Sequence, residues 1–113
     1  MKTDLAIRTV IVGSKYYPGA IGALTDLRPG TSIILVRDGE NPAHDDPDAV
    51  AVMFGLQMLG YLPRSVNKGI ARRMDRGETV PAMLLSEAII EKGEVKMSPR
   101  ILIALDEYPE TSS

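Results

Sequence analysis

The segment from position 38 to position 48 holds the densest group of side chains that could do chemistry. It contains five acids and the one histidine of the 113-residue chain: Asp38, Glu40, Asp45, Asp46, Asp48 and His44. Clustered carboxylates can hold Mg²⁺, as in a metal-dependent nuclease. However, the sequence has no second carboxylate cluster for a two-metal site, and Pro47 interrupts the local spacing. We therefore interpret the segment as an Asp/Pro-rich turn and expect neither a metal nor a cofactor.

A second candidate is the stretch Lys15-Tyr16-Tyr17-Pro18-Gly19, which places two of the four tyrosines side by side. Neighbouring side chains of a strand point to opposite faces, so at least one of these rings should face outward. The stretch alone does not show which of the two rings faces outward or what that ring contacts.

The sequence lacks the residues that several other classes of enzyme require. Without cysteine the chain has no thiolate nucleophile and no Cys-ligated zinc. His44 has no evident partner for a serine or histidine hydrolase. The Gly-x-x-x-x-Gly-Lys loop of ATP-binding proteins is also absent. These enzyme classes are therefore not expected from the sequence.

Charge and hydropathy limit the partners. The net charge of −2 and the sequence pI of about 5.3 argue against a general polyanion binder. Charge is uneven, however, with five basic residues and one acid between positions 60 and 77. No apolar run reaches the roughly 20 residues that span a bilayer, and Asp4 and Arg8 interrupt any signal-peptide core. A cytoplasmic protein without membrane contact is expected.

Short apolar segments separated by turns predict a β-rich domain. The expected strands are Leu5–Val12, Ser32–Arg37, Ala49–Phe54, Gln57–Leu62, Thr79–Glu91 and Val95–Leu105. Pro81 and Pro99 should mark strand edges or bulges, because proline cannot donate to a ladder. A short helical turn is expected near residues 18–24.

One stronger helix is predicted after residue 64. Ser65 is its expected N-cap, and Gly77 should close its end. Val66, Ile70 and Met74 fall on one face at a spacing of four residues, opposite a basic ridge. With about six short strands, this pattern predicts a mainly-β small barrel with one or two short helices, formed by residues 1–105 and followed by a flexible acidic tail, 106–113.

Four motifs occur in an order that resembles the HIRAN domain. They are Val12-Gly13 followed by Lys15-Tyr16-Tyr17-Pro18-Gly19, Asn41-Pro42 after a strand, Asp46-Pro47-Asp48-Ala49-Val50-Ala51-Val52, and Gly60-Tyr61-Leu62-Pro63-Arg64. The resemblance covers about residues 12–77. It implies an OB-like β-barrel that holds the 3′ end of single-stranded DNA and does no chemistry itself.

The resemblance also implies roles for individual residues. Lys15 stands where many relatives have an arginine that meets the backbone phosphates, and Tyr16 matches the base-stacking platform, since single strands are held by aromatic stacking and by cations along the phosphates. Tyr16 is therefore expected to face outward and Tyr17 to pack inward; the alternative is that both rings belong to the core. Asn41 and Asp46 match the loop that recognises the free 3′ hydroxyl. Because this loop is about two residues longer here, either Asp45 or Asp46 could be the acceptor.

Three more positions complete the implied site. Arg64 matches the cation after the Gly-x-Leu motif, Tyr61 occupies a position where some relatives carry histidine, and Lys68 could extend the phosphate track by one helical turn. The implied partners are single-stranded DNA with a free 3′ hydroxyl and a helicase, nuclease or other DNA-processing protein, in repair, at replication forks or in mobile-element defence. The alternative is a protein-interaction module of the same fold. Convergence of the implied residues on one groove would favour DNA binding.

Overall fold

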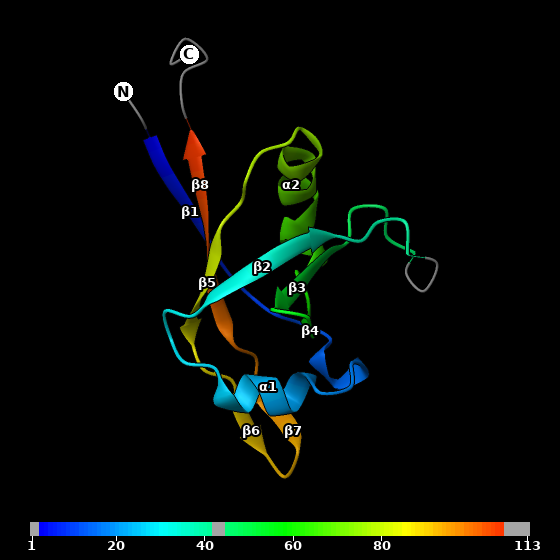
Figure 1. Cartoon of the computed structure of the whole chain (residues 1–113), viewed down its shortest axis with the longest axis vertical. Helices are drawn as coiled ribbons and strands as arrows, with labels where there is room; N and C mark the ends of the chain where they lie inside the picture. The colour runs from blue at the N-terminus through cyan, green and yellow to red at the C-terminus, as the bar shows by residue number, and fades with distance from the viewer. Residues whose placement is uncertain (1–2, 42–44, 108–113) are drawn as a thin grey trace.

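The computed structural model describes residues 3–41 and 45–107, and in these residues the fold is mainly β (Figure 1). The chain order is β1 (Thr3–Val10), the 3-10 helix η1 (Ser14–Tyr16), α1 (Ala20–Asp26), β2 (Ser32–Arg37), β3 (Val50–Phe54), β4 (Gln57–Tyr61), α2 (Arg64–Asp75), β5 (Ala82–Ser86), β6 (Ile89–Glu91), β7 (Glu94–Met97) and β8 (Arg100–Glu107). The expected short helical turn is therefore a helix, α1. Neither α-helix of this described part is long and apolar enough to cross a membrane.

Six of the strands form one antiparallel sheet in the order β1-β8-β5-β2-β3-β4. The sheet curls into a half-barrel, which confirms the predicted mainly-β small-barrel fold. Its two outer strands meet where Val12, just after β1, exchanges two backbone hydrogen bonds of 2.9 Å with Tyr61 on β4. This bridge brings the segment after β1 next to the end of β4.

The core lies on one face of the sheet. Ile33 and Leu35 of β2 are buried, while the residues between and beside them are exposed, as expected for a strand with one buried face. α2 adds Ile70 and Ala71 to the same apolar cluster. The amphipathic pattern of α2 thus fastens this helix to the half-barrel.

The start of α2 differs from the prediction. The helix begins at Arg64 with Pro63 at the N-cap position, and no side chain caps it. The Pro63 carbonyl accepts hydrogen bonds from the amides of Val66 and Asn67. Ser65 therefore lies inside the first turn and cannot be the N-cap residue. The end of the helix is as predicted. Gly77, at φ +87°, follows the last turn, and its amide donates a 2.9 Å hydrogen bond to the Met74 carbonyl.

The two long strands predicted for residues 79–91 and 95–105 are wrong, because each is split in two. β5 and β8 belong to the main sheet, whereas β6 and β7 form a separate hairpin. The chain leaves the sheet after a register shift in β5 between Leu84 and Ser86, and it returns through Ser98-Pro99. Pro99 has no N–H for a ladder, so it separates β7 from β8. β8 reaches Glu107, two residues into the predicted tail, and residues 108–113 lie outside the described part.

Gly60 permits the close approach of the two outer strands. It adopts φ +147°, and a Cβ at this position would lie 2.4 Å from the Val12 carbonyl oxygen and 2.7 Å from Cγ2 of Ile11. We expect Gly60→Ala to lower the free energy of unfolding by about 1–3 kcal/mol in chemical denaturation, because backbone would have to shift. The matched control is Gly69→Ala on exposed α2 surface, where a Cβ meets nothing within 4 Å. This control should stabilise the protein by about 0.5–1 kcal/mol. Equal effects of the two substitutions would contradict the argument.

Candidate functional site

The 3-10 helix η1 makes the side chains of the two consecutive tyrosines point in different directions. In such a helix residues three apart share one side, so Ser14 and Tyr17 face the same way and Tyr16 does not. The buried Ser14 hydroxyl donates a 2.6 Å hydrogen bond to the Leu59 carbonyl and anchors the turn on β4. Tyr16 is 71% exposed, whereas Tyr17 is partly buried. The prediction that Tyr16 faces outward and Tyr17 packs inward is confirmed, although the geometry that separates them is a helical turn.

The inward tyrosine packs on Tyr61 of β4. The two ring centroids lie 5.6 Å apart at an interplanar angle of 45°. The Tyr61 hydroxyl donates to Oδ2 of Asp38, and the Asn41 side-chain amide donates to the same oxygen at 3.1 Å. Burial, followed by the bond to Asp38, raises the pKa of Tyr61 far above its ordinary value. Its hydroxyl therefore stays protonated at neutral pH, and its ring is held in one orientation.

These tyrosines line a surface pocket of about 260 Å³, called here the tyrosine pocket. Its chemically active lining consists of Tyr16, Tyr17, Asp46, Tyr61, Arg64 and Asn67. The residues come from η1, the loop after β2, β4 and the start of α2. The pocket thus combines aromatic rings, one cation and one carboxylate.

Asp46 is held firmly at the edge of this pocket. Its Oδ1 accepts a 3.0 Å bond from the Asp48 amide, and its Oδ2 accepts a 2.9 Å bond from Asn67. Nε of Arg64 lies 3.6 Å from the same Oδ2. The Asp46 side chain remains 15% exposed and Arg64 74% exposed, so both can reach a ligand.

Asn67 was not among the predicted site residues. It is buried, and it lies three and four residues before Ile70 and Ala71, on the apolar face of α2. A polar residue in the apolar stripe of a helix needs a buried hydrogen-bond partner. The place of Asn67 within the apolar stripe of α2 could therefore have predicted that its side chain makes a buried hydrogen bond.

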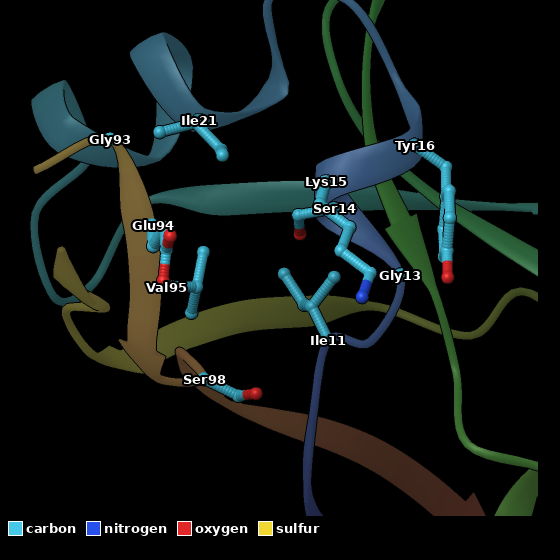
Figure 2. A pocket seen from close by; sticks show the side chains of 10 residues that line it. All are labelled: Ile11, Gly13, Ser14, Lys15, Tyr16, Ile21, Gly93, Glu94, Val95 and Ser98. Carbon is cyan, nitrogen blue, oxygen red and sulfur yellow. The ribbon is translucent and has the colours of Figure 1, made fainter.

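A second cavity of about 540 Å³, called here the hairpin pocket, lies between η1 and the β6–β7 hairpin (Figure 2). It shares Tyr16 and Gly13 with the tyrosine pocket. Figure 2 shows Tyr16 at one side of the opening and Glu94 and Val95 of β7 at the other. Nζ of Lys15 lies 5.1 Å from the centroid of the Tyr16 ring, within the range of a cation–π contact. Tyr16 therefore borders both cavities with a cation beside its ring.

The structure brings together most, but not all, of the predicted site residues. Tyr16, Tyr61, Asp46 and Arg64 line the tyrosine pocket, and Lys15 lines the hairpin pocket. Asn41 lines neither pocket. Its side-chain amide donates to Asp38, which also accepts the Tyr61 hydroxyl. Asp45 and Lys68 are exposed and line neither pocket. His44 lies outside the described residues.

Fold and site together define a small β half-barrel domain with an aromatic and charged pocket where its outer strands meet. The family model of the HIRAN domain matches residues 5–106, so the chain belongs to the HIRAN domain family. The resemblance found in the sequence is confirmed. HIRAN is a family of binding domains, known from nucleic-acid-related proteins.

Individual relatives agree with this assignment. The chain is 40% identical over 77 residues to a Fanconi-associated nuclease 1 homolog of Oryza sativa subsp. japonica. The match covers 65% of this chain but only 7% of that protein, so the chain spans a small part of this relative.

Two solved structures share the fold. A protein from Lactobacillus plantarum has a TM-score of 0.72 at 24% identity, covering 96% of this chain and 100% of that one. The HIRAN domain of human HLTF has a TM-score of 0.66 at 18% identity, covering 89% of this chain and 74% of that one. At these identities the likeness concerns the fold alone.

Proposed function

We propose that this domain binds single-stranded DNA at a free 3′ end in the cytoplasm and performs no chemistry itself. The observation that carries the proposal is the exposed Tyr16 ring, which borders a pocket that also contains Arg64 and Asp46. An aromatic platform next to cations is how proteins hold single strands. The family supports a DNA partner, because HIRAN domains occur in DNA-processing proteins such as a helicase-like factor and a nuclease.

Two neighbouring nucleotides can use the two cavities. The terminal base occupies the tyrosine pocket and stacks on Tyr16, while the next nucleotide enters the hairpin pocket. Lys15 and the exposed Arg64 meet the phosphates on either side of the ring. Lysine offers a point charge without the planar fork of arginine, so Lys15 attracts the backbone more than it orients it.

The carboxylate of Asp46 gives the site its preference for an end. A carboxylate has about four acceptor positions, so it can accept a bond from a 3′ hydroxyl beside those from Asp48 and Asn67. A phosphate at the same position would be repelled by the negative charge. Of the two predicted acceptors we choose Asp46 over Asp45, because Asp46 lines the pocket.

The experiment that tests this function compares matched labelled oligonucleotides by fluorescence polarisation. One strand ends in a 3′ hydroxyl, a second in a 3′ phosphate, and a third has its 3′ end in a duplex. We expect the strongest binding for the free 3′ hydroxyl. Equal binding of the first two strands would reduce the site to a general single-strand binder, and binding of none would refute the proposal.

Salt dependence tests the phosphate contacts. If Lys15 and Arg64 each neutralise one phosphate, log affinity should fall against log salt with a slope of about −0.7 per contact. Lys15→Glu should weaken binding and remove about one such contact from the slope. The matched control is Arg28→Glu, because Arg28 is exposed and lines neither pocket. A slope near zero for the unmodified protein, or equal losses in both variants, would contradict these contacts.

The protein-interaction alternative has one observation in its favour. The outer face of β2 exposes Ile34 and Val36, and apolar side chains on an open sheet face can dock a partner. A protein that binds no oligonucleotide but associates with a partner in a manner sensitive to Ile34→Lys would support that alternative.

A further inference from the structure

The short turn that carries Asp46 is fastened to both ends of α2. At the start of the helix, Arg64 and Asn67 contact the Asp46 carboxylate. At its end, Asp75 pairs with Arg37, the last residue of β2. Residues 46–49 therefore lie between two attachment points on one rigid helix.

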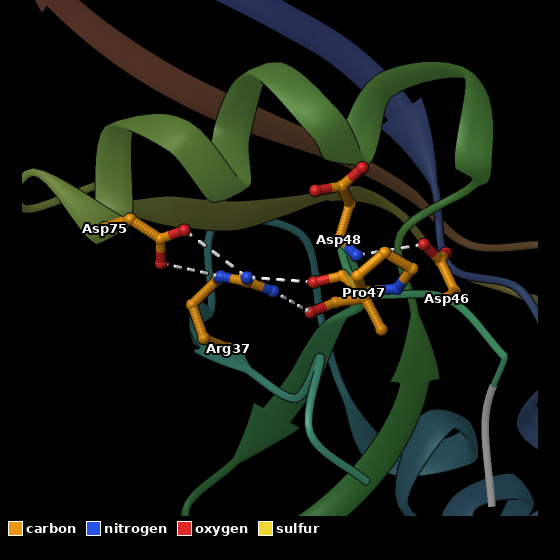
Figure 3. A network of polar contacts seen from close by, with 6 residues as sticks. Arg37, Asp46, Pro47, Asp48 and Asp75 are labelled. Atoms are coloured by element: carbon orange, nitrogen blue, oxygen red, sulfur yellow. Dashed lines mark hydrogen bonds and ion pairs between the residues drawn. The ribbon is translucent and has the colours of Figure 1, made fainter. Parts of the chain in front are cut away.

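Arg37 makes the second attachment with four contacts (Figure 3). Its Nη1 donates to the Ala49 carbonyl at 2.8 Å, and its Nη2 donates to the Pro47 carbonyl at 3.0 Å. On its other side Nε donates to Oδ1 of Asp75 at 2.9 Å, and Nη2 lies 3.4 Å from Oδ2. Only the planar fork of arginine can reach two carbonyls and both carboxylate oxygens together. Lysine at this position would keep the charge and lose most of the contacts.

The contacted carbonyls belong to the turn that orients Asp46. Within this turn the Ala49 amide donates to the Asp46 carbonyl at 3.2 Å, and the Asp48 amide donates to the Asp46 side chain. Arg37 contacts the turn at the carbonyl of Pro47, the residue that follows Asp46. A shift of the Pro47 carbonyl would therefore move the carboxylate that faces the pocket.

The other limb of the loop leaves the turn no room to move toward it. A Cβ on Gly39 would lie 2.1 Å from the Pro47 carbonyl oxygen, so residues 39 and 47 are in close backbone contact. Arg37 and Asp75 favour each other's charged forms, since the carboxylate raises the pKa of Arg37 and the guanidinium lowers that of Asp75. The attachment is thus formed at neutral pH.

We propose that Arg37 and Asp75 are positioning residues that set the 3′-end selectivity of the domain by holding the Asp46 turn against the pocket. The proposal rests on the proposed function and deepens it. Neither residue lines the tyrosine pocket, so neither is assigned a contact with the terminal nucleotide. Partly exposed ion pairs contribute little to global stability, and this pair therefore serves geometry more than stability.

The first test measures the ratio of affinities for 3′-hydroxyl and 3′-phosphate strands. Arg37→Lys and Asp75→Asn should each reduce this ratio by about fivefold, the effect of about one hydrogen bond, while affinity for a strand without free ends changes little. The matched control is Arg73→Lys, because Arg73 is similarly exposed and pairs with Glu78 at 3.1 Å away from the loop. In an Asp46→Asn background, Arg37→Lys should have no further effect on the ratio.

The second test needs no DNA. Amide hydrogen exchange of Asp48 and Ala49 should become faster in Arg37→Lys, while exchange of Val52 in β3 stays unchanged. A wild-type preference that survives Arg37→Lys, or unchanged exchange at Asp48 and Ala49, would overturn the positioning role alone. A wild-type protein without end preference would instead overturn the proposed function, and the claim on selectivity with it.

Discussion

Tyr16→Ala is expected to weaken binding of single-stranded DNA by about 1–3 kcal/mol, because it removes the ring on which we propose the terminal base stacks. The free energy of unfolding should hardly change, since the Tyr16 ring is 71% exposed. Tyr16→Phe keeps the aromatic face and should have a mild effect. Fluorescence polarisation measures the affinity, and chemical denaturation measures the stability.

Tyr17→Ala is the matched comparison, because it removes the same ring from the next residue. The Tyr17 ring packs against Tyr61 at 5.6 Å, so its loss should lower the free energy of unfolding by about 0.5–3 kcal/mol. A stable Tyr17→Ala protein together with an unstable Tyr16→Ala protein would mean that the two faces of η1 are assigned the wrong way round.

The second large effect is expected at Asp46, where loss of the negative charge should strongly reduce the preference for a 3′ hydroxyl over a 3′ phosphate. A hydrogen bond to a charged group contributes about 1.5–3 kcal/mol, which corresponds to roughly tenfold or more in the affinity ratio. Asp46→Asn is the better first variant, because alanine would leave the buried Asn67 amide without its partner. Affinity for internal single-stranded sites should stay constant or rise, since a negative charge is lost. Melting temperatures of the variants show whether the fold is kept.

Asp45→Ala is the control for this prediction. It removes the same charge one residue away, from an exposed side chain that lines neither pocket. The 3′-hydroxyl preference should survive. If Asp45→Ala and Asp46→Asn reduced the preference equally, end selection would arise from the overall charge of the loop and not from one acceptor.

Much of the fold could be predicted from local patterns. Ser32–Arg37 has the predicted bounds because an apolar, β-branched run with one buried face satisfies a strand without further information. The face of α2 that carries Ile70 is buried as its periodicity predicts. Local patterns failed where sheet pairing decides the outcome, as in β5 to β8. A sequence of alternating apolar residues does not show to which of two sheets each half belongs.

The orientation of neighbouring side chains at the pockets is set by contacts between residues that are distant in the sequence. Motif order and the family resemblance named eight candidate residues, and the structure places five of them, Lys15, Tyr16, Asp46, Tyr61 and Arg64, at the two pockets, whereas Asn41, Asp45 and Lys68 line neither. The position of Asp46 at the pocket depends in part on its hydrogen bond with Asn67, which lies 21 residues further along the chain. The support from Arg37 to Asp75 spans 38 residues.

The sequence by itself thus determined the class of fold, the family and the chemical groups available for binding, since these follow from composition, periodicity and the order of short motifs. Only the tertiary structure decided how the groups are arranged. The Val12–Tyr61 bridge closes the outer strands and sets the turn of Tyr16 beside β4, and α2 holds Asp46 at the pocket edge. Such arrangements depend on hydrogen bonds between segments that are distant in the sequence and lie side by side only in the curled sheet. Local sequence patterns therefore cannot predict them.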